Sequence, residues 1–385
     1  MAMHLHIIAF NIPYPPDYGG TIPVFERIKS LHGLGVRIHL HCFRKGRRQA
    51  PELSRYCESV RYYKRSSGIA GMLLGLPYIV SSRINGRLLS DLKGDNYPIL
   101  AEGLHCTGLL LENRWPARII AIRLHNIESQ YYRALARTAP PGLRKGYFRI
   151  ESKRLDAYEK RIAGFPYLFL TVHPHDREYF MTQCGAEKVV YLPPFIPYQV
   201  VHSLGGTGSY NLYHGDLSVP DNERSVMWLV REVWDKEQAP LIIAGLNPTG
   251  RLKRFLRSYP EIRLVENPDA EQMERLVREA QVNCIHSFNT SGIKIKLLHA
   301  LFSGRHCVVT GELLRGTGLE SGCYPVSNAA EFKGKLKELR DIPFNGQDRE
   351  IREKSLREQF DIHRNAKKLM EYLQLSPNPN DGINP

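Results

Sequence analysis

Short apolar runs of β-strand composition alternate with helical patterns along the whole chain, and this alternation most constrains the fold. In the first half the runs lie at residues 4–10, 37–42, 60–63, 99–102, 119–123, 167–172 and 189–192. Helical patterns separate them, as at residues 21–32, where Ile22, Phe25, Ile28 and Leu31 recur at helical spacing. Strands that alternate with helices form a parallel sheet covered on both faces. The sequence therefore predicts one doubly wound domain over residues 1–195.

The alternation stops and then starts again. Residues 196–209 continue a stretch rich in Pro and Gly, which predicts a linker. Further apolar runs follow at residues 211–214, 241–244, 263–265, 282–286, 307–310 and 324–326. We therefore expect an α/β protein with two Rossmann-like domains facing across a cleft, the second at residues 210–345. A helical segment at residues 346–375 can cross back to the first domain, and residues 376–385 form a tail.

Nearly all of the net positive charge of the chain lies in its first half. The 385 residues carry a formal net charge of +14. Residues 1–200 hold 28 Lys and Arg against 15 Asp and Glu, whereas residues 201–385 hold 25 against 24. This asymmetry favours an anionic surface or polymer as a partner of the first domain. The alternative is a solvated basic face that serves solubility.

Three short segments carry this basic excess. One segment contains Arg44, Lys45, Arg47 and Arg48, and another contains Arg61, Lys64 and Arg65 directly before the apolar stretch GIAGMLLGLPYIV. A third, with Lys145, Arg149 and Lys153, forms one stripe on a helix. Cations beside an apolar segment suit contact with an anionic membrane surface or a lipid-linked acceptor. No nucleic-acid motif surrounds them, so nucleic acid is not expected as a partner.

Cysteine spacing and hydropathy bear on the compartment. The 7 cysteines include no Cys-x-x-Cys pair, so neither a disulfide framework nor a zinc site is expected. The apolar run before the first prolines is too short for a secretory segment, and no stretch reaches the roughly 18 apolar residues of a membrane span. The sequence predicts a cytoplasmic protein, soluble or peripheral on the membrane, without a metal or cofactor.

Two loops of the first domain carry candidate ligand groups. In NIPYPPDYGGTIPVFERI, Gly19 and Gly20 let the backbone approach a phosphate at the start of a helix. The alternative is a tight turn that needs glycine, and the dinucleotide spacing G-x-G-x-x-G is absent. In RLHNIESQYY, His125 follows a strand and can offer an imidazole N–H to a sugar hydroxyl or polarise an acceptor. The alternative is a structural histidine.

The second domain contains the most informative stretch, IHSFNTSGIKIKLLHALFSG. A strand ends there, the small-residue turn at residues 290–292 follows, and a helix begins near Ile293. Its N-terminal N–H groups and Lys296 would hold a diphosphate, with His299 one turn further along the same face. The alternatives are a solvated helix face for Lys294 and Lys296, and a boundary position for His299.

Taken in order, these segments resemble glycosyltransferases of the GT-B fold, in particular the family 4-like group of bacterial sugar transferases. The resemblance runs through PYPPDYGG, AEG, RLHNIESQYY, DAYEKRIAGF and HPHD in the first half. It continues through YHGDLSVPDN, LIIAGLNP, SGIKIKLLHALFSG and VVTGELLRGTGL in the second. It implies a nucleotide-sugar donor held by the C-terminal domain, an acceptor held by the N-terminal domain, and transfer with retention of configuration and without a metal.

The resemblance also implies roles for individual residues. His125 would contact the transferred sugar, and Lys296 would neutralise the leaving diphosphate. The donor-binding set that it implies is Gly19, Gly20, Gly215, Gly245, Glu266, Asn267, Ser291, Gly292, Lys294 and His299. The family usually has a glutamate at the position of His299, and members with two such glutamates place the other at the position of Ser291. An imidazole cannot accept from two ribose hydroxyls as a carboxylate does.

Two functional hypotheses follow. The first is a membrane-associated glycosyltransferase that builds surface polysaccharide from a nucleotide sugar. The second is a GT-B-shaped binding or scaffold protein that has lost catalysis, because carboxylates are missing at residues 291 and 299.

Overall fold

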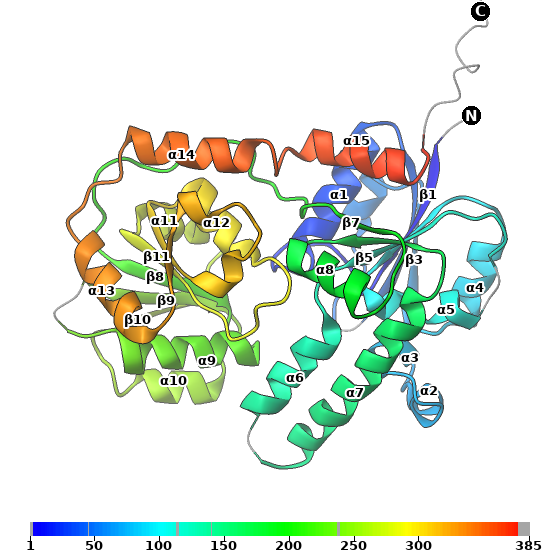
Figure 1. Cartoon of the computed structure of the whole chain (residues 1–385), viewed down its shortest axis with the longest axis horizontal. Helices are drawn as coiled ribbons and strands as arrows, with labels where there is room; N and C mark the ends of the chain where they lie inside the picture. The colour runs from blue at the N-terminus through cyan, green and yellow to red at the C-terminus, as the bar shows by residue number, and fades with distance from the viewer. Residues whose placement is uncertain (1–2, 45, 113–114, 140, 237–238, 376–385) are drawn as a thin grey trace, which may run out of the picture. The chain divides into compact units, whose positions relative to one another are not determined.

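The computed structural model describes residues 3–44, 46–112, 115–139, 141–236 and 239–375. The contacts between residues divide the chain into two compact units. The N-terminal unit consists of residues 1–197 and 362–385, and the C-terminal unit consists of residues 198–361. Each unit is built around one parallel sheet (Figure 1).

The sheet of the N-terminal unit has 7 parallel strands in the order β3-β2-β1-β4-β5-β6-β7. The strands are β1 (His4–Ala9), β2 (Arg37–Arg44), β3 (Ser59–Lys64), β4 (Ile99–Glu102), β5 (Ile120–Leu124), β6 (Leu168–Thr171) and β7 (Val189–Tyr191). The order reverses direction between β1 and β4. In open α/β sheets a crevice forms beyond the carboxyl ends of the strands at such a switch point.

Helices cover both faces of this sheet. They are α1 (Ile22–Gly33), α2 (Ile69–Leu73), α3 (Tyr78–Ser81), α4 (Gly86–Lys93), α5 (Gly108–Glu112), α6 (Glu128–Thr138), α7 (Leu143–Ala163), α8 (Pro174–Thr182) and α15 (Ile362–Tyr372), with short 3-10 turns η1 (Pro51–Arg55) and η2 (Leu104–Cys106). The chain-terminal helix α15 packs along α1, and α6 and α7 form a hairpin that extends beyond the sheet (Figure 1).

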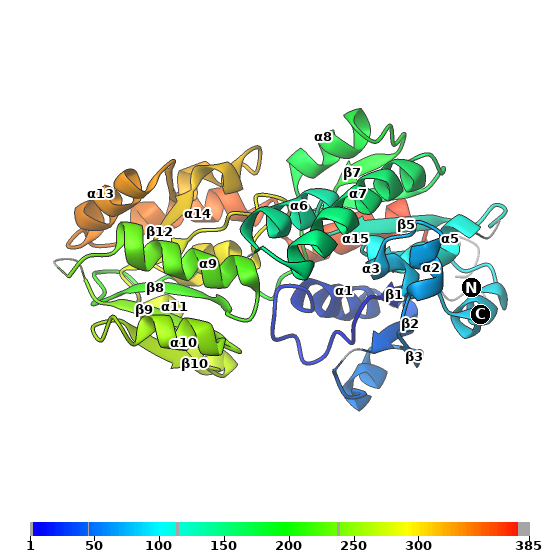
Figure 2. The same cartoon turned by 90° about the horizontal axis from the view of Figure 1, so that it is seen from below.

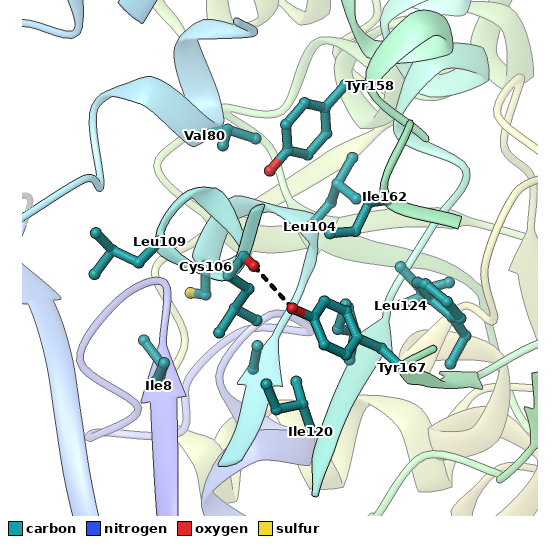
Figure 3. Close-up of a cluster of buried hydrophobic side chains, with 14 of the residues drawn as sticks. Ile8, Val80, Leu104, Cys106, Leu109, Ile120, Leu124, Tyr158, Ile162 and Tyr167 are labelled. Carbon is teal, nitrogen blue, oxygen red and sulfur yellow. Dashed lines mark hydrogen bonds between the residues drawn. The ribbon is translucent and has the colours of Figure 1, made fainter. Parts of the chain in front are cut away.

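The side chains of each strand point alternately to the two faces of the sheet, and each face has its own hydrophobic core. Leu5, Ile7 and Ala9 of β1 pack with α1 and α15, whereas Ile8 points to the opposite face. Figure 3 shows that opposite face, where side chains from strands, η2 and α7 meet. The Tyr167 hydroxyl donates to the Leu110 carbonyl at 2.8 Å, so this buried aromatic ring keeps its polar atom bonded.

The C-terminal unit repeats the same strand order in a 6-stranded sheet, β10-β9-β8-β11-β12-β13. Its strands are β8 (Asn211–Asp216), β9 (Leu241–Leu246), β10 (Arg263–Glu266), β11 (Val282–Ile285), β12 (His306–Thr310) and β13 (Tyr324–Val326). All are parallel to their neighbours. The switch point of this sheet lies between β8 and β11. Every apolar run predicted from the sequence coincides with a strand of one of the two sheets.

Helices also sandwich this second sheet. They are α9 (Pro220–Trp228) with a π-helical continuation η3 (Leu229–Val233), α10 (Gly250–Leu256), α11 (Ala270–Glu279), α12 (Ile295–Ser303), α13 (Ala329–Leu339) and α14 (Gly346–Arg357), with 3-10 turns η4 (Gly311–Leu314) and η5 (Glu320–Gly322). Helices α9 and α10 lie on one face, in front of the sheet in Figure 2, and α11 lies on the other.

The helical segment expected at residues 346–375 is two helices in the structure. Helix α14 belongs to the C-terminal unit, where Arg352 donates to the carbonyls of Gly304 at 2.6 Å and Gly322 at 3.0 Å. Helix α15 belongs to the N-terminal unit. The chain therefore returns to the N-terminal unit between the two helices. The predicted tail, residues 376–385, lies outside the described residues.

Candidate functional site

A buried ion pair lies beside the switch point of the N-terminal sheet. Glu102 closes β4, and its side chain is fully buried beneath α1. The Arg27 guanidinium of α1 donates to Glu102 Oε1 through both Nε, at 2.9 Å, and Nη2. The second carboxylate oxygen, Oε2, lies 3.1 Å from Nε2 of His125, which directly follows β5. The structure thus places the predicted His125 at the carboxyl ends of the strands.

Charges and burial set the ionisation of this group. Burial by itself favours the neutral form of Glu102, but Arg27 and His125 hold the pKa of its carboxyl below the usual range. Burial lowers the pKa of His125, against the attraction of Glu102. A carboxylate beside a neutral imidazole is the resulting state near pH 7.

Arg47, which lies just after β2 in the chain, stabilises the glycine-containing loop before α1. Arg47 donates to the carbonyls of Ile12 at 3.2 Å and Pro15 at 2.8 Å, and it also pairs with Asp17. A Cβ on Gly20 would lie 2.5 Å from the Tyr18 ring, so this position has a steric reason to be glycine. Arg47 therefore supports the loop that contains Gly19 and Gly20.

A cavity of about 280 Å³ lies beside this loop. Its lining residues are Tyr14, Pro15, Asp17, Arg47, Arg48, Gln49, Ala50, Pro51 and Glu52. Because both cations and carboxylates line it, the charge of the cavity favours neither an anionic nor a cationic ligand.

The other predicted surface cations have varied partners. Arg61 pairs with Asp91 of α4, and Arg65 donates to Ser82 Oγ at 3.0 Å. Arg48 and Lys64 are exposed and Arg44 is partly exposed, while Lys45 lies outside the described residues. Of this set, Arg48, Arg61 and Lys64 are thus the exposed cations that the structure describes.

Lys296 occupies the switch point of the C-terminal sheet. Its ammonium group lies 2.8 Å from the Tyr213 hydroxyl of β8, 3.1 Å from Asn222 Oδ1 and 3.3 Å from the His286 carbonyl after β11. It also lies 4.2 Å from the centre of the Tyr213 ring. Burial lowers the pKa of Lys296 to about 7, against the attraction of Asp221. A bound anion would therefore favour its protonated form.

The loop between β11 and α12 is fixed by side-chain bonds. Asp221 accepts from Ser287 Oγ at 2.6 Å and from the Phe288 N–H at 3.1 Å. The Ser291 N–H donates to Asn289 Oδ1 at 3.1 Å, and Lys294 Nζ donates to the Ser291 carbonyl at 2.8 Å. Helix α12 begins at Ile295, two residues later than the sequence suggested.

The predicted glycines of this unit pack tightly against each other. Gly215 and Gly245 are paired at the ends of β8 and β9. A Cβ on Gly245 would lie 1.8 Å from the Gly215 carbonyl oxygen, so residue 245 must be glycine for the strands to approach. Nearby, the Asn267 side chain accepts from the Asn247 N–H at 2.7 Å, and Glu266 pairs with Lys253. These contacts give Gly245, Glu266 and Asn267 structural roles at the carboxyl edge.

His299 is buried on α12 and is bonded to a glutamate of the neighbouring helix. Its Nε2 lies 2.6 Å from Glu274 Oε2 of α11. The Tyr198 ring stacks on the imidazole with centroids 4.8 Å apart. Glu274 also bonds His202, and despite burial these bonds lower its pKa to about 2. A carboxylate thus reaches His299, although the chain has no carboxylate at residue 299 itself.

Sequence reasoning found His125, Lys296 and His299 but missed their partners. Arg27 lies on the inner side of α1, beside Phe25 and Ile28, and Glu102 ends a buried strand. A charged residue inside an otherwise apolar pattern was the available signal for both. Glu274 gave no comparable signal, because α11 carries many charges.

The described part of the chain contains neither a metal-site cluster nor a helix able to span a membrane. No cluster of three or more His, Cys, Asp or Glu side chains there has the arrangement of a metal site. No helix in that part combines the length and apolar character needed to cross a bilayer.

Comparison of the sequence with known proteins identifies a distant relative. No protein-family model matches the chain. A protein of Klebsiella pneumoniae, described as an uncharacterised 44.6 kDa protein in the cps region, is 26% identical over 341 residues, covering 82% of this chain and 85% of that protein.

Solved structures are similar over almost their full length. Sucrose-phosphate synthase from Thermosynechococcus elongatus has a TM-score of 0.70 at 14% identity and covers 97% of this chain and 99% of its own. TarM, a Staphylococcus aureus protein also solved as a variant with UDP, has a TM-score of 0.67 at 10% identity, with 97% and 99% covered. Anabaena HepE, solved with UDP and glucose, has a TM-score of 0.65 at 10% identity, with 97% and 99% covered.

The two sheets have the same switched strand order, each with charged or histidine side chains at its carboxyl edge. Together with the full-length structural likeness, this confirms the fold expected from the sequence. The chain has the GT-B fold of nucleotide-sugar glycosyltransferases.

Proposed function

We propose that the chain is a glycosyltransferase that moves a sugar from a nucleoside diphosphate sugar to a glycan or lipid-linked acceptor. The observation that carries the proposal is Lys296, a partly buried cation at the β8/β11 switch point of a GT-B fold. The Klebsiella relative from a cps region supports a role in surface-polysaccharide assembly. TarM and HepE, whose structures contain UDP, support a nucleotide-sugar donor.

The proposed chemistry relies on charge and position. Lys296 and the amino end of α12 supply positive potential for the departing diphosphate. The departing phosphate oxygen can take the proton of the acceptor hydroxyl, so sugar transfer needs chiefly alignment of the two substrates. Retention of configuration and independence of metal are parts of this proposal.

Transfer and hydrolysis assays across UDP- and GDP-sugars test the activity. Lys296→Met should lower the transfer rate by at least about a hundredfold, because it removes charge stabilisation of the leaving group. Lys335→Met is the matched control, since Lys335 also lies over a tyrosine ring of this unit, that of Tyr324 at 5.4 Å. A folded Lys296→Met variant with full activity would exclude the assigned role. A wild type that neither turns over nor binds any nucleotide would exclude the function.

A second candidate function is a scaffold without catalysis. It is favoured by Ser291 and His299 at positions where related enzymes carry carboxylates. The His299→Glu variant separates the two. Nucleotide affinity should rise if the site is degraded. It should fall if His299, bonded to Glu274, is matched to the donor of this protein.

We extend the proposal to the cytoplasmic face of a membrane. Leu73 at the end of α2 and Leu74 directly after it are 83% and 80% exposed, and Leu143 at the start of α7 is 95% exposed. Helix α2 packs on α3, and Glu151 of α7 accepts from the Ile79 N–H of α3, so these elements are contiguous. Lys64, at the end of β3, and Arg149 of α7 are exposed cations of the neighbouring segments of the chain. Exposed apolar groups beside cations favour an anionic bilayer surface.

Sedimentation with vesicles tests this extension. The full-length protein should bind phosphatidylglycerol vesicles and lose binding in Leu73→Ser/Leu74→Ser. The control is Ile342→Ser, which alters an exposed apolar residue of the other unit. Equal binding by all three proteins, or no binding by the wild type, would contradict membrane association without affecting the proposed transfer activity.

A further inference from the structure

The contact between His125 and Glu102 defines which imidazole nitrogen carries the proton. Glu102 also accepts from Arg27, so it is a carboxylate and can only accept hydrogen bonds. His125 Nε2 lies 3.1 Å from it and must therefore donate. A neutral imidazole that donates through Nε2 has its lone pair on Nδ1.

The surroundings hold this arrangement in place. Arg27 is 1% exposed and Glu102 is 0% exposed, so the carboxylate cannot turn toward water without leaving a buried charge unpaired. The titratable groups facing His125 come from four elements: Arg27 of α1, Glu102 of β4, His105 of η2 and Arg123 of β5. Burial lowers the pKa of His125 and keeps the ring neutral near pH 7.

The lone pair of His125 is available to a ligand. Among the residues that the structure describes, none is hydrogen-bonded to Nδ1, and 18% of the side chain is exposed. The ring of Phe10, just after β1, meets the imidazole edge-on with centroids 5.7 Å apart. Residue 10 follows β1 and residue 102 ends β4, the two strands that flank the switch point, and residue 125 follows β5 beside β4, so all three lie where a ligand of this fold is expected.

We propose that Glu102 is a positioning residue that fixes His125 as a hydrogen-bond acceptor for a carbohydrate hydroxyl, with Arg27 holding the carboxylate. This inference rests on the proposed glycosyltransferase function and specifies its N-terminal site. It reverses the expectation from the sequence, in which the imidazole offers its N–H to the sugar. A site with this polarity rejects a deoxy sugar, because Nδ1 would be left without a partner.

Nuclear magnetic resonance of the full chain measures the protonation state directly. With ¹⁵N-labelled histidine, the wild type at pH 7.5 should show His125 as the Nε2–H form, assigned by the signals lost in His125→Gln. Adding a UDP- or GDP-sugar, alone or with acceptor, should shift Nδ1 and leave Nε2 nearly unchanged. An Nδ1–H form or an imidazolium at this pH would overturn the proposal.

Steady-state kinetics test the role of the carboxylate. Arg27→Met/Glu102→Met removes both charges together, so that no buried charge is left unpaired. We expect kcat to fall about a hundredfold, with the donor KM changed less than about twofold. The control is Asp95→Asn, which alters another carboxylate bonded to an arginine and a histidine in the same unit and should leave kcat unchanged.

The two measurements separate the possible failures. Retained kcat in the double variant would overturn the positioning role even if the Nε2–H form is found. If the double variant does not fold, the resonance measurement on the wild type still decides the orientation of the imidazole. A wild type that transfers no sugar would remove the proposed function, while the protonation state of His125 is read without any turnover.

Discussion

An arginine, a carboxylate and a histidine meet at each end of the N-terminal sheet. At the carboxyl end they are Arg27, Glu102 and His125. At the amino end, Asp95 lies 3.1 Å from Arg118 and 3.0 Å from Nε2 of His6. The two groups differ in the hydrogen bonding of the second imidazole nitrogen, Nδ1. Nδ1 of His6 lies 2.8 Å from Nε2 of His41, whereas Nδ1 of His125 has no hydrogen bond among the described residues.

The amino-end group is part of a longer polar ladder. His4 and His6 of β1 lie on the same face as His39 and His41 of β2, because alternate residues of a strand share a face. His41 continues the ladder to the Tyr63 hydroxyl at 2.8 Å, and Tyr63 donates to Asp91 at 2.5 Å. Since each bond ends on another protein group, this end serves stability. At the carboxyl end, the same three residue types leave one atom, Nδ1 of His125, available to a ligand.

The largest expected effect is on the free energy of unfolding. Glu102→Ala should destabilise the N-terminal unit by about 3–5 kcal/mol, because it leaves the buried Arg27 charge unpaired. Asp95→Ala should cost less, about 1–2 kcal/mol, because the buried Arg118 guanidinium still donates to the backbone carbonyls of Leu92, Asp95 and Tyr97. Urea titrations, with hydrogen exchange of the β1 and β4 amides as the readout, measure the free energy of unfolding of both variants. Equal losses of stability in the two variants would show that the carboxylates at the two ends of the sheet contribute equally despite their different burial.

The next expected effect separates activity from stability. His125→Gln should lower transfer about a hundredfold with little change in melting temperature, since only one bond to Glu102 is altered. His6→Gln should leave transfer intact and lower the melting temperature by a few degrees, because it breaks the bond to His41. Rates and thermal unfolding are measured on the same preparations. A loss of transfer in His6→Gln would show that both ends serve catalysis.

The ladder also predicts that acid destabilises the protein. Burial lowers the pKa of His6 to about 4 and that of His41 to about 2, so both stay neutral in the fold. The unfolded chain takes up protons below its ordinary histidine pKa of about 6.5, so stability is complete above that pH and falls as the pH drops further. His6 alone should cost about 3 kcal/mol at pH 4.

Unfolding titrations from pH 7 to pH 4.5 check this prediction. The curve of stability against pH should be flatter in His6→Gln than in the wild type, because the variant lacks the titrating imidazole. Parallel curves would show that acid acts elsewhere in the chain.

The smallest expected effect has the opposite sign and belongs to the carboxyl end. Burial raises the pKa of Glu128 to about 8 and that of Glu159 to about 7, so both bind protons in the fold that the unfolded chain releases above about pH 4.5. Stability from these groups therefore falls as the pH rises toward 8. Glu159→Gln keeps an oxygen for the Ser129 N–H and should be more stable than the wild type by about 1–2 kcal/mol at pH 8.

The same variant provides its own control at low pH. At pH 5 Glu159 is protonated in the fold, so the stabilities of Glu159→Gln and the wild type should converge. A constant difference from pH 5 to pH 8 would mean that the gain is unrelated to ionisation.

The sequence predicted the elements well and the side-chain partners poorly. His125 was singled out because it follows a strand, and Lys296 because it lies in the first turn of a helix that follows a strand and a small-residue turn. Contact of Arg47 with a membrane surface or an acceptor stays a prediction, and the sequence did not reveal that Arg47 bonds the loop that contains the predicted phosphate-binding glycines. The basic excess of the first half is thus partly internal: Arg27 and Arg123 are each 1% exposed.

The sequence alone determined the strands, the helices and the repeat of one doubly wound pattern, because apolar periodicity is a local property of the chain. Only the tertiary structure decided what each polar side chain bonds. Glu102 meets Arg27 across 75 residues, and it does so because the sheet places β4 beside β1 beneath α1. Such a contact depends on strand order and on burial, which together fix both the charge of Glu102 and the free nitrogen of His125. Neither can be read from the spacing of residues along the chain.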